Sequence, residues 1–527
     1  MGDTAVDGLN RPGRLAGGSA GTGDPAEYKI AYDGITFDDV LLLPRASDVM
    51  PADADTPSRF SRNIRLNIPL ISAPMDTVTE SALAIALAQE GGLGIVHRNL
   101  SIEAQAREVS KVKRSANGVI LDPITLGPTD SVGRARDLMR QYNVSGFPIT
   151  EDGAQVLRSK GRVLGILTRR DLKFVEDENT PVSEVMTADG LITAPPGTTL
   201  EEAERILNRN KVEKLLLIDG GGRLAGMVTQ RDIDRMTQFP RAMTDARGRL
   251  LCGAACGVDH YERVEALIAA EADVIVIDTS HGHSENVLRT VRTIKQKYGV
   301  EVVAGNVATA EAAKALIAAG ADGIKAGIGP GSICTTRIVT GVGVPQISAI
   351  FNAVRGVRES GVGADEVPVI ADGGVRTSGD MAKAIAAGAH AVMMGSLFAG
   401  LDESPGEHVI SHGRRYKAYR GMGSEGAMSA GSADRYGQGR DGQKTLKFVP
   451  EGVEGLVPYR GNVAEFVYQL VGGLRASMGY CGCRTIDEFR EKTRFCRVTQ
   501  ASVVESHPHD IRITREAPNY TVDGSGG

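Results

Sequence analysis

The chain of 527 residues is long enough for about two to four domains with a full-sized hydrophobic core. Its net charge of −5 and its ordinary fractions of apolar (42%) and charged (24%) residues give no basic footprint, so nucleic acid is not expected as a partner. No apolar run reaches the roughly 18 residues of a transmembrane helix, and six cysteines in so long a chain do not form a disulfide framework. We therefore expect a soluble, enzyme-sized protein of the cytoplasm with reduced thiols.

A flexible tail precedes the first regular pattern. Residues 1–27 are rich in Gly, Asp and Ala and have no apolar core, which predicts a mobile N-terminus and excludes a signal peptide. From residue 69 onward, short apolar runs alternate with segments of helical periodicity. The predicted strands are residues 69–73, 92–97, 251–257, 274–278, 302–306, 323–327, 367–372 and 391–395. The predicted helices between and after them are residues 81–90, 101–114, 261–270, 283–298, 309–319, 347–359 and 378–387.

The order of these elements predicts the fold class. Near-continuous apolar strands that alternate with amphipathic helices indicate a parallel sheet covered by helices, an α/β protein. Eight strand–helix units are the number that closes a TIM (β/α)8 barrel, whose active site lies at the C-terminal ends of the strands. An open doubly wound sheet is the alternative.

A stretch of about residues 118–236 interrupts the alternation and contains an internal repeat. Helical segments at residues 130–139 and 198–207 each lead to an apolar strand and then to a Thr-x-x-Asp signature. The signature residues are Thr168 and Asp171 in the first copy and Thr229 and Asp232 in the second. A hydroxyl and a carboxylate at a strand-to-helix turn suit a ribose or a phosphate, although a helix cap is the more frequent use of the same residues. The pair of copies predicts a satellite domain inserted into the barrel.

The loop at residues 327–337 reads Gly-Ile-Gly-Pro-Gly-Ser-Ile-Cys-Thr-Thr-Arg and follows a predicted strand. Its glycines allow close approach of the backbone to a ligand, with N–H groups free to bind an anion. Cys334 lies among the hydroxyls of Ser332, Thr335 and Thr336. An anion cradle beside a thiol indicates covalent chemistry on a phosphorylated substrate. The alternative is a cysteine that only fills a core.

Several long motifs in order resemble the inosine-5′-monophosphate (IMP) dehydrogenase family, over about residues 34–520. The cysteine loop is one of them. The others are Ile-Thr-Phe-Asp-Asp-Val-Leu-Leu (35–42), Met-Asp-Thr-Val-Thr-Glu (75–80), Ala-Asp-Gly-Gly (371–374), Tyr-Arg-Gly-Met-Gly-Ser (419–424) and Glu-Ser-His-Pro-His-Asp (505–510). The insert resembles the family's tandem CBS module. The resemblance implies barrel segments at 28–117 and 238–527, CBS modules at 118–178 and 179–237, and a flap at about 423–452.

The resemblance also implies the chemistry. Cys334 would attack C2 of the purine, hydride would pass to NAD, and the covalent thioimidate would be hydrolysed to xanthosine monophosphate. The flap would then enter the vacated NAD site, where Arg435, paired with Tyr436 and helped by Thr336, would activate water. Without the family, Arg435 reads as a phosphate-binding or surface residue, because a guanidinium in solution is always protonated.

Binding residues come partly from the strand ends and partly from the resemblance. A TIM barrel places phosphate after strands seven and eight, which end here at Asp372-Gly373-Gly374 and Gly395-Ser396. For IMP the full set is Met75, Asn306, Ser332, Asp372, Gly373, Gly374, Gly395, Ser396, Tyr419, Gly421, Met422, Gly423 and Glu451. For NAD it is Asp278, Ser280, Gly327 and Gly329. For a potassium ion it is the backbone of Gly329, Gly331 and Cys334, with Glu505, Ser506 and His507 from a neighbouring subunit.

The resemblance implies a homotetramer, with an octamer formed through the CBS modules as the alternative. Adenine or guanine nucleotides are expected at Thr168, Asp171, Thr229 and Asp232. Two other functions compete with IMP dehydrogenase. A GMP reductase shares the barrel and the cysteine loop, but the Arg435–Tyr436 flap and the insertion argue against it. A nucleotide sensor with a silent barrel is disfavoured by the intact Cys334, Thr336, Arg435 and Tyr436.

Overall fold

The computed structural model describes residues 29–115, 119–142, 144–153, 155, 158–363, 367–438 and 448–520. The predicted tail at residues 1–27 and residues 439–447 of the predicted flap lie outside these ranges. The chain divides into two compact units. The first comprises Met1–Leu87, Gly92–Val109 and Cys252–Gly527, and the second comprises Ala88–Gly91 and Ser110–Leu251. The predicted insertion limits, 118 and 237, lie inside the second unit.

The first unit is a closed barrel of eight parallel strands, so the predicted TIM barrel is confirmed. The first strand of the predicted order pairs with the eighth, and the second pairs with the third, which leaves no open edge and excludes the doubly wound sheet. The strands are almost entirely buried and mostly apolar, as a sheet covered by helices requires. They are β4 (Leu70–Ser72), β5 (Leu93–Val96), β11 (Gly253–Cys256), β12 (Val274–Asp278), β13 (Glu301–Val307), β14 (Gly323–Ala326), β15 (Val369–Asp372) and β16 (Ala391–Met394).

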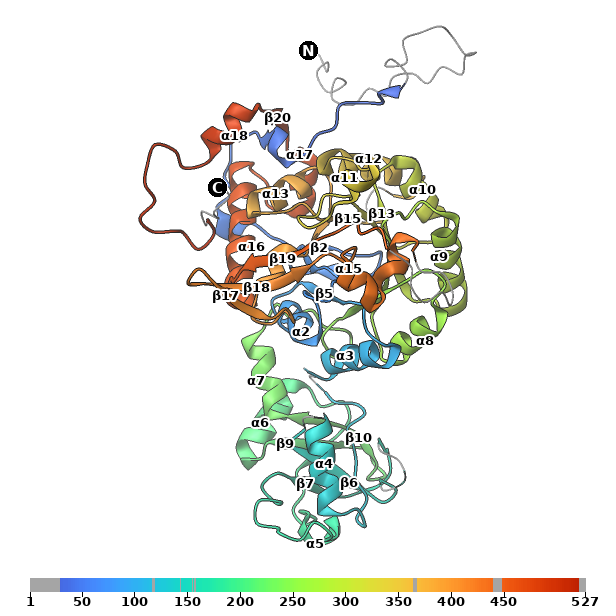
Figure 1. Ribbon diagram of the computed structural model, residues 1–527. Helices are drawn as coiled ribbons and strands as arrows, with labels where there is room; N and C mark the ends of the chain where they lie inside the picture. Colours follow the sequence, from blue (N-terminus) through green and yellow to red (C-terminus); the bar gives the residue numbers. More distant parts are fainter. Residues whose placement is uncertain are drawn as a thin grey trace. The chain divides into compact units, whose positions relative to one another are not determined.

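Helices surround these strands in Figure 1. Several begin at a threonine whose hydroxyl accepts a hydrogen bond from the third helical N–H, as at Thr309 and Thr377, so the sequence itself marks where they start. The helices are α2 (Ser81–Gln89), α3 (Ile102–Ser115), α8 (Tyr261–Ala269), α9 (Glu285–Tyr298), α10 (Ala310–Ala318), α12 (Gln346–Glu359), α13 (Ser378–Ala386), α16 (Val463–Tyr480) and α17 (Ile486–Lys492).

Smaller elements surround the barrel, and the sequence did not predict them. An antiparallel sheet joins β17 (His408–Ser411), β18 (Arg414–Arg420) and β19 (Glu454–Pro458), and it carries Tyr419 and Arg420. Short helices follow two barrel strands, α11 (Thr336–Thr340) and α14 (Ser396–Ala399). Near the C-terminus, β20 (Phe495–Arg497) pairs with β1 (Val40–Leu42), and α18 (Gln500–Ser506) follows it.

The second unit repeats one arrangement twice, each copy with its own apolar cluster. In the first copy α4 (Val132–Tyr142) accompanies the pair β6 (Gly146–Thr150) and β7 (Val163–Thr168). In the second, α6 (Leu200–Asn210) accompanies β8 (Thr193–Ala194), β9 (Lys214–Ile218) and β10 (Leu224–Thr229). The copies differ after the Thr-x-x-Asp signature, where the second continues into α7 (Gln230–Gln238) and the first forms turns.

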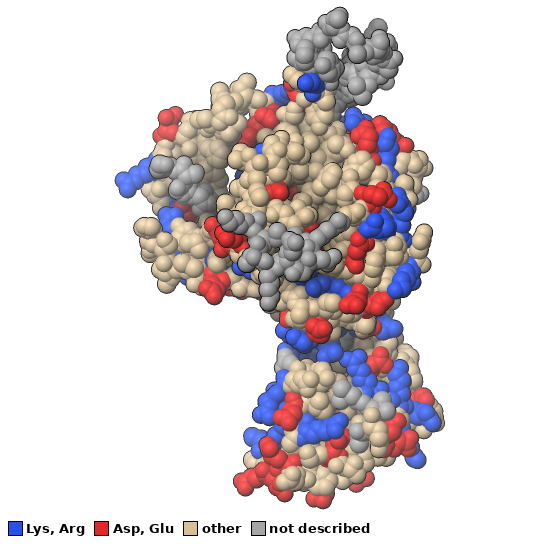
Figure 2. All heavy atoms as spheres, turned by 45° about the vertical axis from the view of Figure 1, so that its right-hand side comes forward, with Lys and Arg blue, Asp and Glu red and all other residues tan. Residues whose placement is uncertain are grey.

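Acidic and basic side chains are interspersed over the visible face of each unit (Figure 2), which matches the balanced composition. Within the ranges that the structure describes, no helix combines the length and the apolar character needed to cross a bilayer.

Candidate active site

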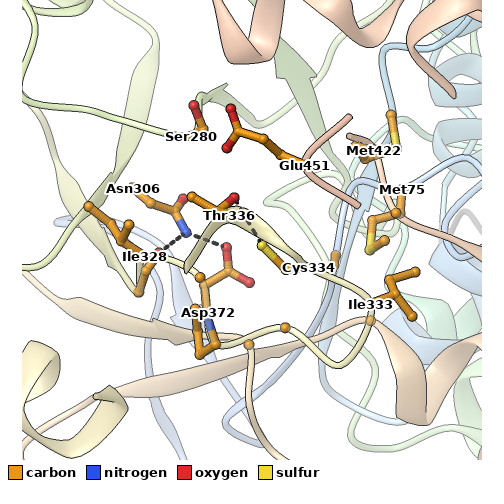
Figure 3. A pocket seen from close by; sticks show the side chains of 18 of the residues that line it. Met75, Ser280, Asn306, Ile328, Ile333, Cys334, Thr336, Asp372, Met422 and Glu451 are labelled. Carbon is orange, nitrogen blue, oxygen red and sulfur yellow. Dashed lines mark hydrogen bonds between the residues drawn. The ribbon is translucent and has the colours of Figure 1, made fainter. Parts of the chain in front are cut away.

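A cleft of about 780 Å³, counting the space at its open mouth, lies at the C-terminal ends of the barrel strands. Figure 3 shows Cys334, Thr336, Asn306 and Asp372 on its floor, with Met75, Met422 and Glu451 around them. Most of the lining follows directly after β4, β12, β13, β14, β15 and β16, the end of the barrel where a TIM barrel places its chemistry.

The cysteine loop leaves β14 through Gly327, whose φ of +143° is a conformation that side-chain-bearing residues rarely adopt. A Cβ at this position would lie 2.3 Å from the carbonyl oxygen of Asp372, so only glycine fits. The Cys334 thiol is half-buried and donates a hydrogen bond to Thr336 Oγ1 over 3.2 Å. The backbone N–H of Thr335 donates to the Glu451 carbonyl over 2.9 Å, which ties the loop to the segment after the predicted flap.

A buried charge network lies beneath the cleft. Lys325 on β14 is fully buried, and its Nζ donates to Asp278 Oδ1 over 2.8 Å and to Asp372 Oδ2 over 2.6 Å. Asn306 Nδ2 donates to the same Asp372 oxygen over 2.9 Å. The amide oxygen of Asn306 is buried and has no hydrogen-bond partner among the described residues, so it is free to accept from a ligand. Lys325 thus fixes the two carboxylates that end β12 and β15.

Two glycines and the buried Tyr419 form one wall of the cleft. Gly373 and Gly374 both have positive φ and pack against Pro330 of the cysteine loop. Burial raises the pKa of Tyr419, and a hydrogen bond with Ser332 acts in the opposite direction. The neutral Tyr419 hydroxyl therefore remains a hydrogen-bond donor beside the glycine pair, at an end of the cleft where small residues leave room for a ligand.

The described part of the predicted flap folds into the mouth of the cleft. It comprises α15 (Glu425–Ala427) and two short turns, η3 (Met428–Ser432) and η4 (Ala433–Tyr436). The Arg435 guanidinium forms an ion pair with Asp278, and the Arg435 carbonyl accepts hydrogen bonds from Ser280 N (3.2 Å) and Ser280 Oγ (3.0 Å). Burial lowers the pKa of Arg435, while the neighbouring Tyr436 raises it. A guanidinium in this environment loses its proton more readily than one in water.

The structure brings most of the predicted site residues together. Those that line the cleft are Met75, Ser280, Asn306, Gly327, Gly329, Gly331, Cys334, Thr336, Asp372, Gly373, Gly395, Tyr419, Gly421, Met422, Arg435, Tyr436 and Glu451. Asp278 lies beneath the lining, and Gly423 packs against the Tyr436 ring. Ser332, Gly374 and Ser396 adjoin lining residues in the chain.

Two predicted groups lie elsewhere. Glu505, Ser506 and His507 are exposed at the end of α18 and do not line the cleft of their own chain. In the second unit, Thr168 N and Oγ1 both donate to Asp171 Oδ2, at 2.7 and 2.8 Å, as in a helix cap. Thr229 ends β10, and the side chain of Asp232 lies outside the described residues.

Sequence reasoning missed Lys325 and Arg98. A lysine inside an otherwise apolar strand was the signal for Lys325, because a buried charge needs a partner. Its partners lie 47 residues away in both directions, so no local pattern names them. Arg98 gave no signal, since arginines after strands are common on surfaces.

Comparison with known proteins agrees with this geometry. Residues 34–509 match the family model described as the IMP dehydrogenase / GMP reductase domain. An inosine-5′-monophosphate dehydrogenase from Rhodopirellula baltica is 58% identical over 95% of this chain and 90% of its own length. One from Bacillus subtilis is 54% identical over 94% of this chain and 99% of its own. A crystal structure of GMP reductase from Trypanosoma brucei in complex with guanosine 5′-monophosphate superposes with a TM-score of 0.81 at 40% identity, covering 91% of this chain and 98% of its own.

The chain belongs to the IMP dehydrogenase / GMP reductase family. Both curated relatives named above are inosine-5′-monophosphate dehydrogenases, and this chain is an NAD-dependent oxidoreductase. The family resemblance and the enzyme class predicted from the sequence are thereby confirmed. The prediction that the insertion argues against a GMP reductase was wrong. The T. brucei GMP reductase covers 91% of this chain, which is more than the barrel unit alone, so it matches part of the second unit as well. An insertion therefore does not distinguish the two activities.

Proposed function

We propose that the cleft oxidises IMP to xanthosine 5′-monophosphate with Cys334 as the nucleophile, the committed step of guanine nucleotide synthesis. The observation that carries this is the Cys334 thiol, hydrogen-bonded to Thr336, in one cleft with Asp372 and Arg435. The sulfur adds to C2 of the purine, and the hydride of C2 leaves. NAD, when bound, supplies the hydride acceptor. Water then adds to C2 and gives a proton to the Arg435 side chain in its neutral form. The carbon–sulfur bond breaks to release Cys334 as a thiolate, which takes up a proton to restore the thiol.

The chain's own residues suit both ligands. Asp372 is positioned to accept from the ribose hydroxyls of IMP, while the glycine pair after it and the Tyr419–Ser332 pair face the phosphate. Asn306, whose amide oxygen is unpaired, meets a donor of the bound ligand. Asp278 and Ser280 receive the nicotinamide ribose when the Arg435 turn is away. These two residues contact that turn here, and the contacts support its proposed role in hydrolysis.

The test is NADH formation, followed by absorbance, from IMP and NAD in the presence of potassium. We expect steady turnover that depends on both substrates. The same preparation is offered guanosine monophosphate with NADPH, since the reductase shares the cysteine loop and the barrel. Turnover with that pair and none with IMP contradicts the proposed function and favours the reductase. Silence with both pairs favours a sensor with an inactive barrel.

A potassium ion and a second subunit complete the proposal. Gly329, Gly331 and Cys334 line the cleft within one loop, and the Gly331 carbonyl, which accepts the Cys334 N–H over 3.1 Å, has a second lone pair for an ion. They would hold the ion together with Glu505, Ser506 and His507 of a neighbour in a homotetramer. Replacing potassium by lithium is expected to lower kcat, and equal rates in the two salts contradict the ion site. Light scattering distinguishes a tetramer from an octamer formed through the second unit.

The second unit is proposed to be a tandem CBS module that binds adenine or guanine nucleotides through Thr168, Asp171, Thr229 and Asp232. The repeated folds with separate apolar clusters support this assignment. Calorimetric titration of ATP and of GTP onto the full chain is expected to give heat that Asp171→Ala reduces. No heat with either nucleotide contradicts the assignment.

All six cysteines are free, which supports a reducing compartment such as the cytoplasm.

A further inference from the structure

The carboxylate next to Arg435 is held outside the cleft. Asp434 directly precedes Arg435 in η4, and Nη1 of Arg98 lies 2.8 Å from its Oδ2 and 2.7 Å from its Oδ1. The Arg98 side chain is only 7% exposed, and Nε2 of His260 lies 3.7 Å from Oδ2. A hydrogen-bonded pair in which one partner is buried and both are ionised is stronger than an exposed ion pair.

The place where Asp434 binds is shaped for a carboxylate. Gly257 follows β11, and a Cβ there would lie 2.8 Å from Asp434 Oδ2 and 3.2 Å from Arg98 Nη1. The absence of a side chain at Gly257 therefore makes room for the ion pair. Arg98 follows β5, which is hydrogen-bonded to β11, so two adjacent barrel strands fix the position of the Asp434 carboxylate.

Neither Arg98 nor Gly257 nor His260 lines the cleft. Asp278 and Ser280, by contrast, hold the Arg435 turn and are the residues proposed to receive NAD. These two residues are proposed to contact either occupant, so their contacts with the turn are partly offset by their contacts with NAD. Arg98 hydrogen-bonds Asp434 of the turn and lies outside the cleft lining, and a group that binds one of two competing states shifts the equilibrium toward that state.

We propose that Arg98 is a positioning residue for the hydrolytic step. It binds Asp434 and so keeps the η4 turn in the cleft mouth with Arg435 on Asp278. This rests on the proposed function, because it presumes that the turn and NAD exclude one another. Arg98 acts through Asp434 and touches neither substrate. It also adds positive charge near Arg435, which lowers the pKa of that guanidinium.

The test separates the two chemical steps in Arg98→Gln. Rapid mixing with IMP and NAD measures hydride transfer as an initial burst of NADH, and the later linear phase measures hydrolysis. We expect an unchanged burst rate constant and a steady-state rate lowered about tenfold, the factor that loss of one charged hydrogen bond gives. Inhibition by excess NAD should begin at about tenfold lower concentration, because NAD competes with a more weakly held turn.

Three further variants make the result specific. Arg98→Lys retains the charge and is expected to recover part of the steady-state rate. Arg98→Gln combined with Asp434→Asn should lower the steady-state rate no more than either single change does, since the two residues act through one contact. The matched control is Arg292→Gln on α9, whose pair with Glu285 is exposed, and it should leave both phases unchanged.

Two outcomes overturn the inference alone: both phases of Arg98→Gln equal to wild type, or the burst slowed as much as the linear phase. The second would mean that Arg98 only supports the fold. A wild-type enzyme that gives no NADH from IMP overturns the proposed function and the inference with it.

Discussion

Replacement of Cys334 by alanine is expected to abolish NADH formation from IMP, with kcat falling by on the order of 10⁴-fold or more, as for other catalytic nucleophiles. The reason is chemical: without the sulfur no covalent bond to C2 forms, and neither Thr335 nor Thr336 offers an equivalent nucleophile at the cleft floor. The measurement is steady-state NADH absorbance together with intact-protein mass after mixing with IMP and NAD. Wild type should carry the mass of the purine adduct and the variant should not.

Cys496→Ala is the matched control, because Cys496 is also partly exposed but lies on β20, where its thiol donates to the Leu41 carbonyl. It should retain wild-type turnover. The Cys334 variant should still bind IMP calorimetrically, since Asp372, the glycine pair and Tyr419 are untouched. Turnover that survives in Cys334→Ala, or an adduct on another cysteine, contradicts the assignment.

The barrel could be predicted because its strands carry their own signal. Most are short apolar runs buried on both faces, so composition marks them, as in Val274–Asp278. The sheet β17–β19 gave no such signal. Its middle strand, Arg414–Arg420, contains four cationic side chains, and it is a strand because both neighbours supply hydrogen bonds. Pairing across distant segments is invisible to a local pattern.

The candidate site likewise contains residues that a local sequence pattern predicts and residues that it does not. Cys334 and its glycines lie in one loop, so spacing alone placed a thiol beside an anion cradle. The role of Arg435 came from resemblance, because nothing local distinguishes it from a surface arginine. The structure supplies the missing physical reason: the side chain is mostly buried on Asp278, and burial lowers its pKa. Contacts that join three strands, such as those of Lys325, require the closed barrel.

Lys325→Met is expected to destabilise the protein and to weaken IMP binding together. Methionine fills much of the same volume but leaves two buried carboxylates, Asp278 and Asp372, without the cation that both contact. Removing one partner from a buried ion pair costs about 3–5 kcal/mol. The measurements are the free energy of unfolding in urea and the KM for IMP, which should rise because Asp372 loses its fixed position.

If removing one of the two carboxylates restores stability, then unbalanced charge, and not a change of shape, causes the stability loss in Lys325→Met. The double variant Lys325→Met with Asp278→Asn should therefore recover part of the stability lost in Lys325→Met. Its NAD binding should be weak, because Asp278 is proposed to receive the nicotinamide ribose. Lys314→Met is the matched control, since its exposed pair with Glu359 contributes at most about 1 kcal/mol. If the double variant is less stable than Lys325→Met, the cost lies in packing. In that case the buried lysine fills the barrel and does not set the charge balance of the two sites.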